Sequence, residues 1–517
     1  MDENMEKENE KARPRQKGKY LSKKSSGALK FWRYLGSGIL IVAFICLMGW
    51  GVSTILDGSR IGNSGVIGDP TVPDPTGNVA NSADQATDGV TDTTESETTE
   101  ATEDPEILLQ ELRLQAEPLI KEAEFVAAGY DYQKAIEILQ SFEHYDLLPE
   151  LSEKVLHYRE QDALLVTYPD MSKVTHIFFH SLIVDPARAF DRDGDSSGYN
   201  LYMTTCDEFW AMMEAMYARG FVLVSPYDVA YEVDGPEGKY FTYGEIRLPE
   251  GKKPFIMSQD DLNYYSYMIG TGSGVNETPI FADTNGDGFA HRIVIGDDGY
   301  PTCEYMDKSG NVTTGDYDLV PLLEKFIQEH PDFSYHGARA VLGMTGYEGV
   351  FGYRTKPSYE NALGSVKYAQ EVEAAKAVAQ CLRDHGWILA SHSYGHPAYG
   401  NISADRVRAD SDKWENTVQP IIGDCDIILY PHGSDIARSD EYTKDNAKFV
   451  ALYEDGYRYF FNVDSSVYWS FLGDTYYRGG RRNLDGYRMW HHPKRLADLF
   501  DVNEVFDKAR PTPVPSL

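Results

Sequence analysis

Residues 371–396 read EVEAAKAVAQCLRDHGWILASHSYGH and join an amphipathic helical stretch to a short apolar run that ends in a polar cluster. The same succession recurs from about Tyr168 onward, with helical stretches such as CDEFWAMMEAMYARG (206–220) and DLVPLLEKFIQEH (318–330). The apolar runs are HIFFHSLI, FVLVSP, KPFIMS, ARAVLGM, GWILAS, CDIILYP and RYFFNVD. Alternation of strands and helices predicts parallel βαβ units and therefore an α/β sheet or barrel.

Polar side chains follow most of these apolar runs. The clusters are Gln259-Asp260-Asp261, His392 to His396, His432 to Asp435, Asp464 to Ser466, His180-Ser181, and a loop with Tyr347, Tyr353 and Arg354. In a parallel barrel the carboxyl ends of all strands lie on one face, which is where active sites are built. We therefore expect these clusters to converge although they are far apart in sequence.

Two histidines four residues apart, His392 and His396, can lie on one turn and face a single metal ion. A carboxylate from another strand would complete three protein ligands and leave one position open, the arrangement of a catalytic rather than a structural site. The recurrence of acids and histidines at strand ends carries this inference, because each pair alone is common in so acidic a chain.

The order of these clusters resembles that of the polysaccharide deacetylases of the NodB-homology group, carbohydrate esterase family 4. The resemblance covers about Thr175 to Asp507 and implies a distorted (β/α) barrel. An intact H-[ST]-x-x-H motif at His392 and His396 implies two metal ligands. The Asp pair implies Asp261 as the third ligand and Asp260 as the general base.

The chain departs from the family pattern in three places. Leu262 stands where the first motif has glycine, and the third motif, Leu429 to Gly433, lacks its arginine. Arg354, Arg481 or Arg482 are the candidates to replace that arginine beside the base. The last motif, L-x-H, is matched by Met489-Trp490-His491, which makes His491 the implied general acid.

The resemblance implies an extracytoplasmic hydrolase of carbon–nitrogen bonds other than peptide bonds, a polysaccharide N-deacetylase. The expected cofactor is a divalent metal ion, with zinc as the first choice, and the expected substrate is peptidoglycan or a chitin-like glycan. A backbone N–H near Tyr430 would help hold the oxyanion. The predicted substrate-binding residues are Tyr430, His432, Arg354 and Asp464. The alternative is a catalytically inactive NodB-like module that binds glycan at the cell surface.

The N-terminus predicts a single-pass membrane protein. Nine Lys and Arg and no acid lie between Lys11 and Arg33, within a basic tail of residues 1–34. The 22 uncharged residues Leu35 to Leu56 span about 33 Å as a helix, enough to cross a bilayer core. The basic flank places the N-terminus in the cytoplasm and the catalytic domain outside. A cleaved signal peptide is the rival interpretation, and its n-region would be unusually long.

Two segments separate this helix from the predicted catalytic domain at residues 170–510. Residues 57–105 are rich in Gly, Ser, Thr, Asp and Glu and predict a disordered linker. Residues 106–165 have apolar positions at three- and four-residue spacing and predict a small helical segment that Gly129 interrupts. This segment is a spacer or a docking site for a protein partner.

The overall charge argues against nucleic acid as a partner. The chain of 517 residues has 81 acidic and 48 basic residues, a net charge of −33, whereas binding to nucleic acid needs a basic surface. The five cysteines form no CxxC pair, so we expect free thiols rather than a disulfide framework or a cysteine zinc site.

Overall fold

The computed structural model describes residues 105–270, 281–464 and 466–517. The predicted basic tail, the predicted membrane helix and all but the last residue of the predicted linker therefore lie outside the described residues. Among the residues that are described, no helix combines the length and the apolar character needed to span a bilayer.

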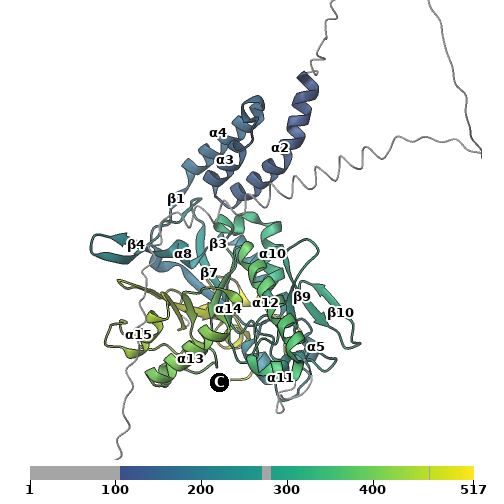
Figure 1. Cartoon of the computed structure of the whole chain (residues 1–517), viewed down its shortest axis with the longest axis vertical. Coiled ribbons are helices and arrows are strands. Elements are labelled where there is room, and N and C mark those ends of the chain that lie inside the picture. Colours follow the sequence, from purple (N-terminus) through teal and green to yellow (C-terminus); the bar gives the residue numbers. More distant parts are fainter. Residues whose placement is uncertain (1–104, 271–280, 465) are drawn as a thin grey trace, which may run out of the picture. The chain divides into compact units, whose positions relative to one another are not determined.

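Within the described part of the chain, seven parallel strands close into a barrel (Figure 1). Their order around the ring is β11-β12-β13-β14-β16-β2-β7, and β7 pairs again with β11. The strands are β2 (Thr175–Phe179), β7 (Lys253–Gln259), β11 (Val341–Met344), β12 (Ile388–Ser391), β13 (Ile427–Leu429), β14 (Tyr459–Val463) and β16 (Tyr477–Asn483). The predicted α/β barrel is confirmed.

The ring is distorted where it closes. The first half of β7 pairs with β3 (Phe221–Leu223), whereas its last residues, Ser258 and Gln259, pair with β11. A short antiparallel strand, β15 (Ser470–Leu472), lies on β16. The predicted strand FVLVSP thus forms β3 beside the seam and is not one of the seven strands of the ring.

The seventh strand of the ring, β16, is not among the predicted runs. Its sequence YRGGRRN contains no aliphatic residue, yet six of its seven residues are buried. Two glycines allow close packing, and the buried guanidinium groups of Arg478, Arg481 and Arg482 pair with carboxylates. The apolar pattern failed here because the buried side chains of the strand itself include three arginines, whose charges are matched by ion pairs.

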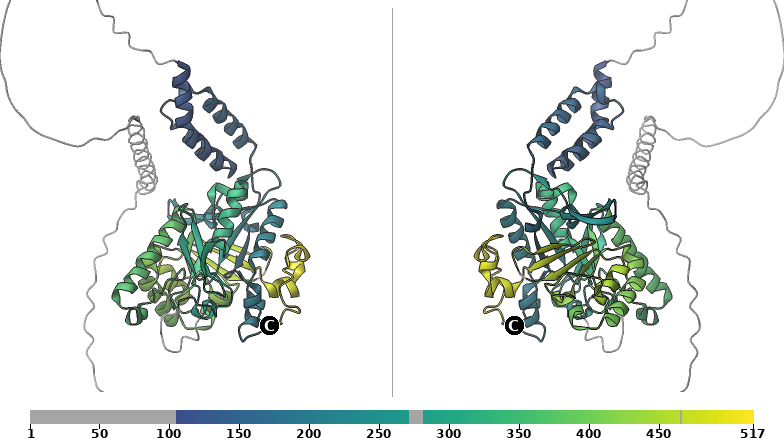
Figure 2. Two further views of the ribbon diagram at one scale, coloured as in Figure 1. Left: turned by 90° about the vertical axis from the view of Figure 1, so that its right-hand side faces the viewer. Right: turned by 90° about the vertical axis from the view of Figure 1, so that its left-hand side faces the viewer.

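Successive side chains of a strand alternate between the interior of the barrel and the layer of surrounding helices, where Ile428 and Phe460 join a separate cluster. Ile256, Leu429 and Phe461 belong to the cluster inside the barrel, whereas Phe255 and Met257 belong to the larger cluster between the strands and the surrounding helices. Helices surround the strands in both views of Figure 2. They include α7 (Cys206–Ala218), α10 (Leu319–Glu329), α12 (Ser365–Asp384), α13 (Ala404–Thr417) and α15 (Ala447–Glu454).

A small helical segment precedes the barrel, as the sequence predicts. Its helices are α2 (Pro105–Ala128), α3 (Tyr132–Gln140) and α4 (Pro149–Leu164). They share an apolar cluster of their own. The segment is joined to the barrel domain by polar contacts, including the hydroxyl of Tyr130, which donates to the carbonyl of Asp332 at 2.9 Å.

A long insertion separates β7 from β11, and it adds a three-stranded antiparallel sheet beside the barrel. The sheet consists of β8 (Arg292–Ile295), β9 (Pro301–Met306) and β10 (Val312–Gly315). The four cysteines in the described part of the chain are free thiols.

Candidate active site at the carboxyl ends of the strands

Three side chains from two strand ends converge on one point. The Nε2 atoms of His392 and His396 lie 3.1 Å apart. The Oδ2 atom of Asp261 lies 3.9 Å from Nε2 of His392 and 3.7 Å from Nε2 of His396. Ligands around a tetrahedral ion at about 2.0–2.2 Å lie roughly 3.3–3.6 Å from one another, so this spacing suits a single small divalent ion.

Local backbone geometry produces the convergence. Asp261 follows β7 directly after Asp260, and His392 follows β12. Asp261, Ser393 and His396 all have positive φ values of 56–64°, which non-glycine residues adopt only at a cost. The turn is held by the Ser393 hydroxyl, which accepts a hydrogen bond from the His396 amide at 3.0 Å. Strained backbone conformations of this kind cluster at functional sites, where they fix the directions of side chains.

The imidazoles are prepared to act as ligands through Nε2. The Nδ1 of His392 lies 2.7 Å from the carbonyl of Leu429, to which it donates, and this leaves Nε2 with a free lone pair. Burial lowers the pKa of His396 to about 4, so its ring is neutral at neutral pH. The predicted ligands Asp261, His392 and His396 thus form one cluster that could hold a metal ion.

Asp260 lies beside this cluster and is held by an arginine. Its Oδ1 accepts from Nη1 of Arg481 at 2.5 Å, and its Oδ2 lies 4.0 Å from Nε2 of His392. Burial would raise the pKa of Asp260, but the Arg481 guanidinium and then His392 outweigh burial and hold it below its usual range. Asp260 is therefore an ionised carboxylate with one oxygen directed to the site.

Of the three candidate arginines, Arg481 on β16 is the one that contacts Asp260. The other two candidates are engaged elsewhere: Arg482 pairs with Asp498 at 2.7 Å, and Arg354 lies 3.5 Å from Glu348. Arg354 was also predicted to bind substrate, but it is 1% exposed and donates to the carbonyl of Tyr264. The guanidinium of Arg354 is buried inside the domain, so it is not accessible to a substrate.

The other predicted substrate-binding residues lie in different surroundings. His432 is exposed, and its ring packs edge-on against that of His396 at 4.4 Å, at the mouth of the cluster. Asp464 is exposed at the end of β14. Tyr430 is fully buried, its hydroxyl accepts from Tyr442, and its backbone N–H donates to Phe461. The N–H of Tyr430 itself is therefore occupied and does not face an oxyanion.

His491, the predicted general acid, is directed away from the cluster. It ends α16 (Gly486–His491), and its Nε2 lies 3.1 and 2.9 Å from the carbonyls of Val514 and Pro515. In the described part of the chain, no hydrogen bond or ring contact joins it to Asp261, His392 or His396.

His180 lies closer to the site. It follows β2, and the pairing of Phe179 with Gln259 places it next to Asp260 on the neighbouring strand. Its Nδ1 donates to the carbonyl of Tyr202 at 3.2 Å, which leaves Nε2 free. The charge of His180 is among the influences that lower the pKa of both Asp260 and Asp261. The sequence places His180 directly after a predicted strand, but the match to the last family motif pointed to His491 as the general acid.

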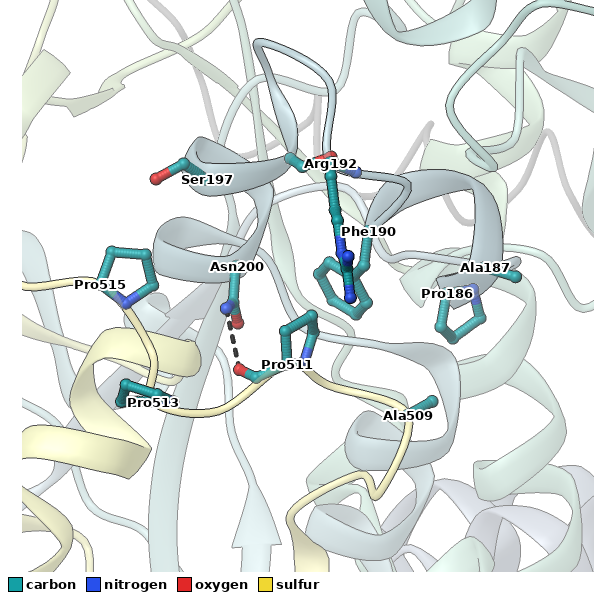
Figure 3. A pocket seen from close by; sticks show the side chains of 11 residues that line it. Pro186, Ala187, Phe190, Arg192, Ser197, Asn200, Ala509, Pro511, Pro513 and Pro515 are labelled. Atoms are coloured by element: carbon teal, nitrogen blue, oxygen red, sulfur yellow. Dashed lines mark hydrogen bonds between the residues drawn. The ribbon is translucent and has the colours of Figure 1, made fainter.

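A cavity of about 460 Å³ lies away from this cluster, between α5 (Pro186–Ala189), α6 (Ser196–Tyr202) and the C-terminal tail (Figure 3). Proline rings from the tail and Phe190 form much of its wall, and Asn200 donates to the carbonyl of Pro511 at 3.0 Å. Neither a carboxylate nor an imidazole is among the residues that line it, and its polar lining consists of Arg192, Ser196, Ser197 and Asn200.

Known proteins were compared by sequence and by structure. No family model and no curated protein matches the sequence. The fold is similar to that of the Streptococcus pyogenes deacetylase PplD in complex with acetate, with 12% sequence identity and a TM-score of 0.32. The alignment covers 65% of this chain and 99% of that protein. A similarity of this size says nothing by itself about activity.

Proposed function

We propose that this chain is a metal-dependent deacetylase that removes N-acetyl groups from a polysaccharide outside the cell. The observation that carries the proposal is the convergence of Asp261, His392 and His396 on one point, with the ionised carboxylate of Asp260 at its side. Two imidazoles and one carboxylate are a donor set typical of catalytic zinc sites.

The bound ion would polarise the acetamide carbonyl and bring the pKa of water toward about 7. Asp260 then has the task of accepting the proton of the attacking water through Oδ2, while Arg481 holds Oδ1 and fixes the direction of the carboxylate. The pair is almost fully buried, so no bulk water competes for this hydrogen bond.

Departure of the amine requires a proton donor on the other side of the substrate. We assign this task to the doubly protonated form of His180, whose Nε2 carries the proton that the amine takes up, because the ring lies beside Asp260 and only its Nδ1 is bonded, to Tyr202. The contacts of His491 with the C-terminal tail make it the weaker candidate.

The location and the class of glycan are proposals that the sequence supports. We propose that residues 35–56 anchor the protein in the cell membrane and that residues 57–105 give the enzyme reach into the cell wall. Peptidoglycan is then the nearest N-acetylated polymer. The exposed ring of His432 and the carboxylate of Asp464 are the residues we assign to contact with the sugar.

The test is release of acetate from N-acetylated chitooligosaccharides and from peptidoglycan by the full-length chain loaded with Zn²⁺. We expect acetate and a free amine in equal amounts, and loss of both after treatment with a chelator. A zinc-loaded chain that binds these glycans but releases no acetate would contradict the proposal and favour the inactive binding module.

A further inference from the structure

Tyr265 contacts the carboxylate oxygen of Asp261 that does not face the histidines. Its hydroxyl lies 2.6 Å from Oδ1 of Asp261, whereas Oδ2 of the same carboxylate faces both imidazoles. The tyrosine is 3% exposed, so water does not compete for this hydrogen bond. The two carboxylate oxygens therefore have different partners before any ion is bound.

The single proton of the phenol can go to only one acceptor. Asp261 Oδ1 is a charged acceptor at 2.6 Å, Asn263 Oδ1 lies at 3.4 Å, and Thr345 Oγ1 lies at 2.6 Å. Hydrogen bonds to a carboxylate are the stronger ones, so Tyr265 donates to Asp261. The Thr345 hydroxyl then donates to the phenol oxygen.

Thr345 is itself fixed by its neighbours. It follows β11, and both its backbone groups are bonded to the Asn263 side chain: its N–H donates at 3.0 Å, and its carbonyl accepts at 2.8 Å. Thr345 and Asn263 are both fully buried. The preceding residue, Met344, accepts the backbone N–H of His392 at 2.9 Å. The same strand end thus positions a ligand histidine and the tyrosine.

Ring stacking fixes the remaining freedom of Tyr265. Its ring is nearly parallel to that of Tyr347 at 4.8 Å and to that of Tyr267 at 5.9 Å. The phenol therefore cannot swing away from Asp261 without breaking a stack of three rings.

We propose that Tyr265 is a positioning residue that restricts Asp261 to one ligating oxygen and so keeps a position at the metal site open for substrate. This inference rests on the proposed function. Without the phenol, Oδ1 would lose its partner and could turn toward the ion together with Oδ2. Partners of this kind typically change metal affinity or activity by about 10- to 100-fold.

The experiment measures zinc affinity of the full-length chain by competition with a chromogenic chelator, for wild type and Tyr265→Phe. Tyr267→Phe is the matched control, because it removes a hydroxyl from the same stack that makes no bond to Asp261. We expect the zinc Kd to rise by about 10- to 100-fold in Tyr265→Phe and to stay unchanged in Tyr267→Phe.

Cobalt substitution separates positioning from a general structural effect. Four-coordinate Co²⁺ absorbs visible light more strongly than five- or six-coordinate Co²⁺. We expect the absorption of Co²⁺ to weaken in Tyr265→Phe, because a second carboxylate oxygen joins the ion. An unchanged Kd and spectrum in Tyr265→Phe would overturn the inference, as would equal changes in both variants.

A second variant covers the case in which Tyr265→Phe fails to fold. Thr345→Val keeps the phenol but removes the hydroxyl that donates to it, and we expect a smaller, several-fold rise in the zinc Kd. An unchanged Kd in a folded Thr345→Val would then overturn the inference. A wild type that takes up no zinc would instead overturn the proposed function itself, and the inference with it.

Discussion

Two groups of three side chains in the described part of the chain are close enough to hold a metal ion, and they differ in almost every other respect. Asp261, His392 and His396 form one, and Asp412, Glu415 and Asp455 form the other. The first lies at the ends of two barrel strands, whereas the second lies on and beside the helices α13 and α15. Proximity alone therefore does not distinguish a catalytic centre from a cluster of surface acids.

The surroundings of the ligand atoms make the difference. In the first group, Leu429 fixes one imidazole and Tyr265 fixes one carboxylate oxygen. In the second, all three members are carboxylates, and the pKa of Glu415 is raised to about 7 by burial and by the charges of its two neighbours. The first group combines two imidazoles with one carboxylate and could hold a cation. In the second group, protonation of Glu415 reduces the repulsion among three carboxylates.

The largest expected effect separates the two groups directly. His392→Ala should lose tightly bound zinc, because it removes one of three protein ligands, and its acetate release should fall to the background level. Glu415→Gln should keep one equivalent of zinc and full activity. Elemental analysis of both purified variants checks this expectation, and equal zinc contents would refute it.

The next effect is confined to the first group. Asp260→Asn should keep its zinc but lose about 10²- to 10⁴-fold in the rate of acetate release, because general-base catalysis typically supplies that factor. Asp261→Asn should lose both zinc and activity, because a neutral amide is a poor ligand. Steady-state assays with zinc quantified in the same samples distinguish the adjacent carboxylates. Near wild-type turnover in Asp260→Asn would place the base elsewhere.

The general acid is tested by a pair of histidines. His180→Gln should reduce the rate by about 10²-fold or more at unchanged zinc content, since a proton donor contributes on that scale. His491→Gln should stay near wild type, because its ring contacts only the tail and its neighbours. The reverse order of the two rates would restore the sequence-based assignment of His491.

The smallest effect concerns the second group and its pH dependence. The folded-state pKa of Glu415 lies above its usual value of 4.5, so the folded state holds the proton more tightly than the unfolded state. The contribution of protonated Glu415 to the stability of the fold is fully present below about pH 4.5 and is lost as the pH rises through about 7. Glu415→Gln should therefore raise the Tm at pH 8 by roughly 1 °C and leave it unchanged at pH 4. A lower Tm at pH 8 would show that the carboxylate is stabilising.

Sequence reasoning located the strand ends and the residues that follow them, because parallel topology sends Asp260, Asp261, His392 and His396 to one face whatever the details of packing. It missed β16, whose burial depends on ion pairs that only the folded chain assembles. It could not choose among three arginines for the partner of Asp260, because Arg481 comes from β16, which is separated from β7 by β2 in the ring. The sequence did not point to Tyr265 either, because its proposed role depends on its contact with Asp261 in the folded chain and not on a sequence motif.

The central claim is that Asp261, His392 and His396 bind one divalent ion. X-ray absorption spectroscopy of the full-length chain with one equivalent of Zn²⁺ tests it most directly. We expect nitrogen and oxygen ligands at about 2.0–2.1 Å from the zinc ion, with scattering from two imidazoles and no sulfur near about 2.3 Å. His392→Ala should abolish this shell. A zinc shell without imidazole scattering, or one that is identical in wild type and His392→Ala, would contradict the account.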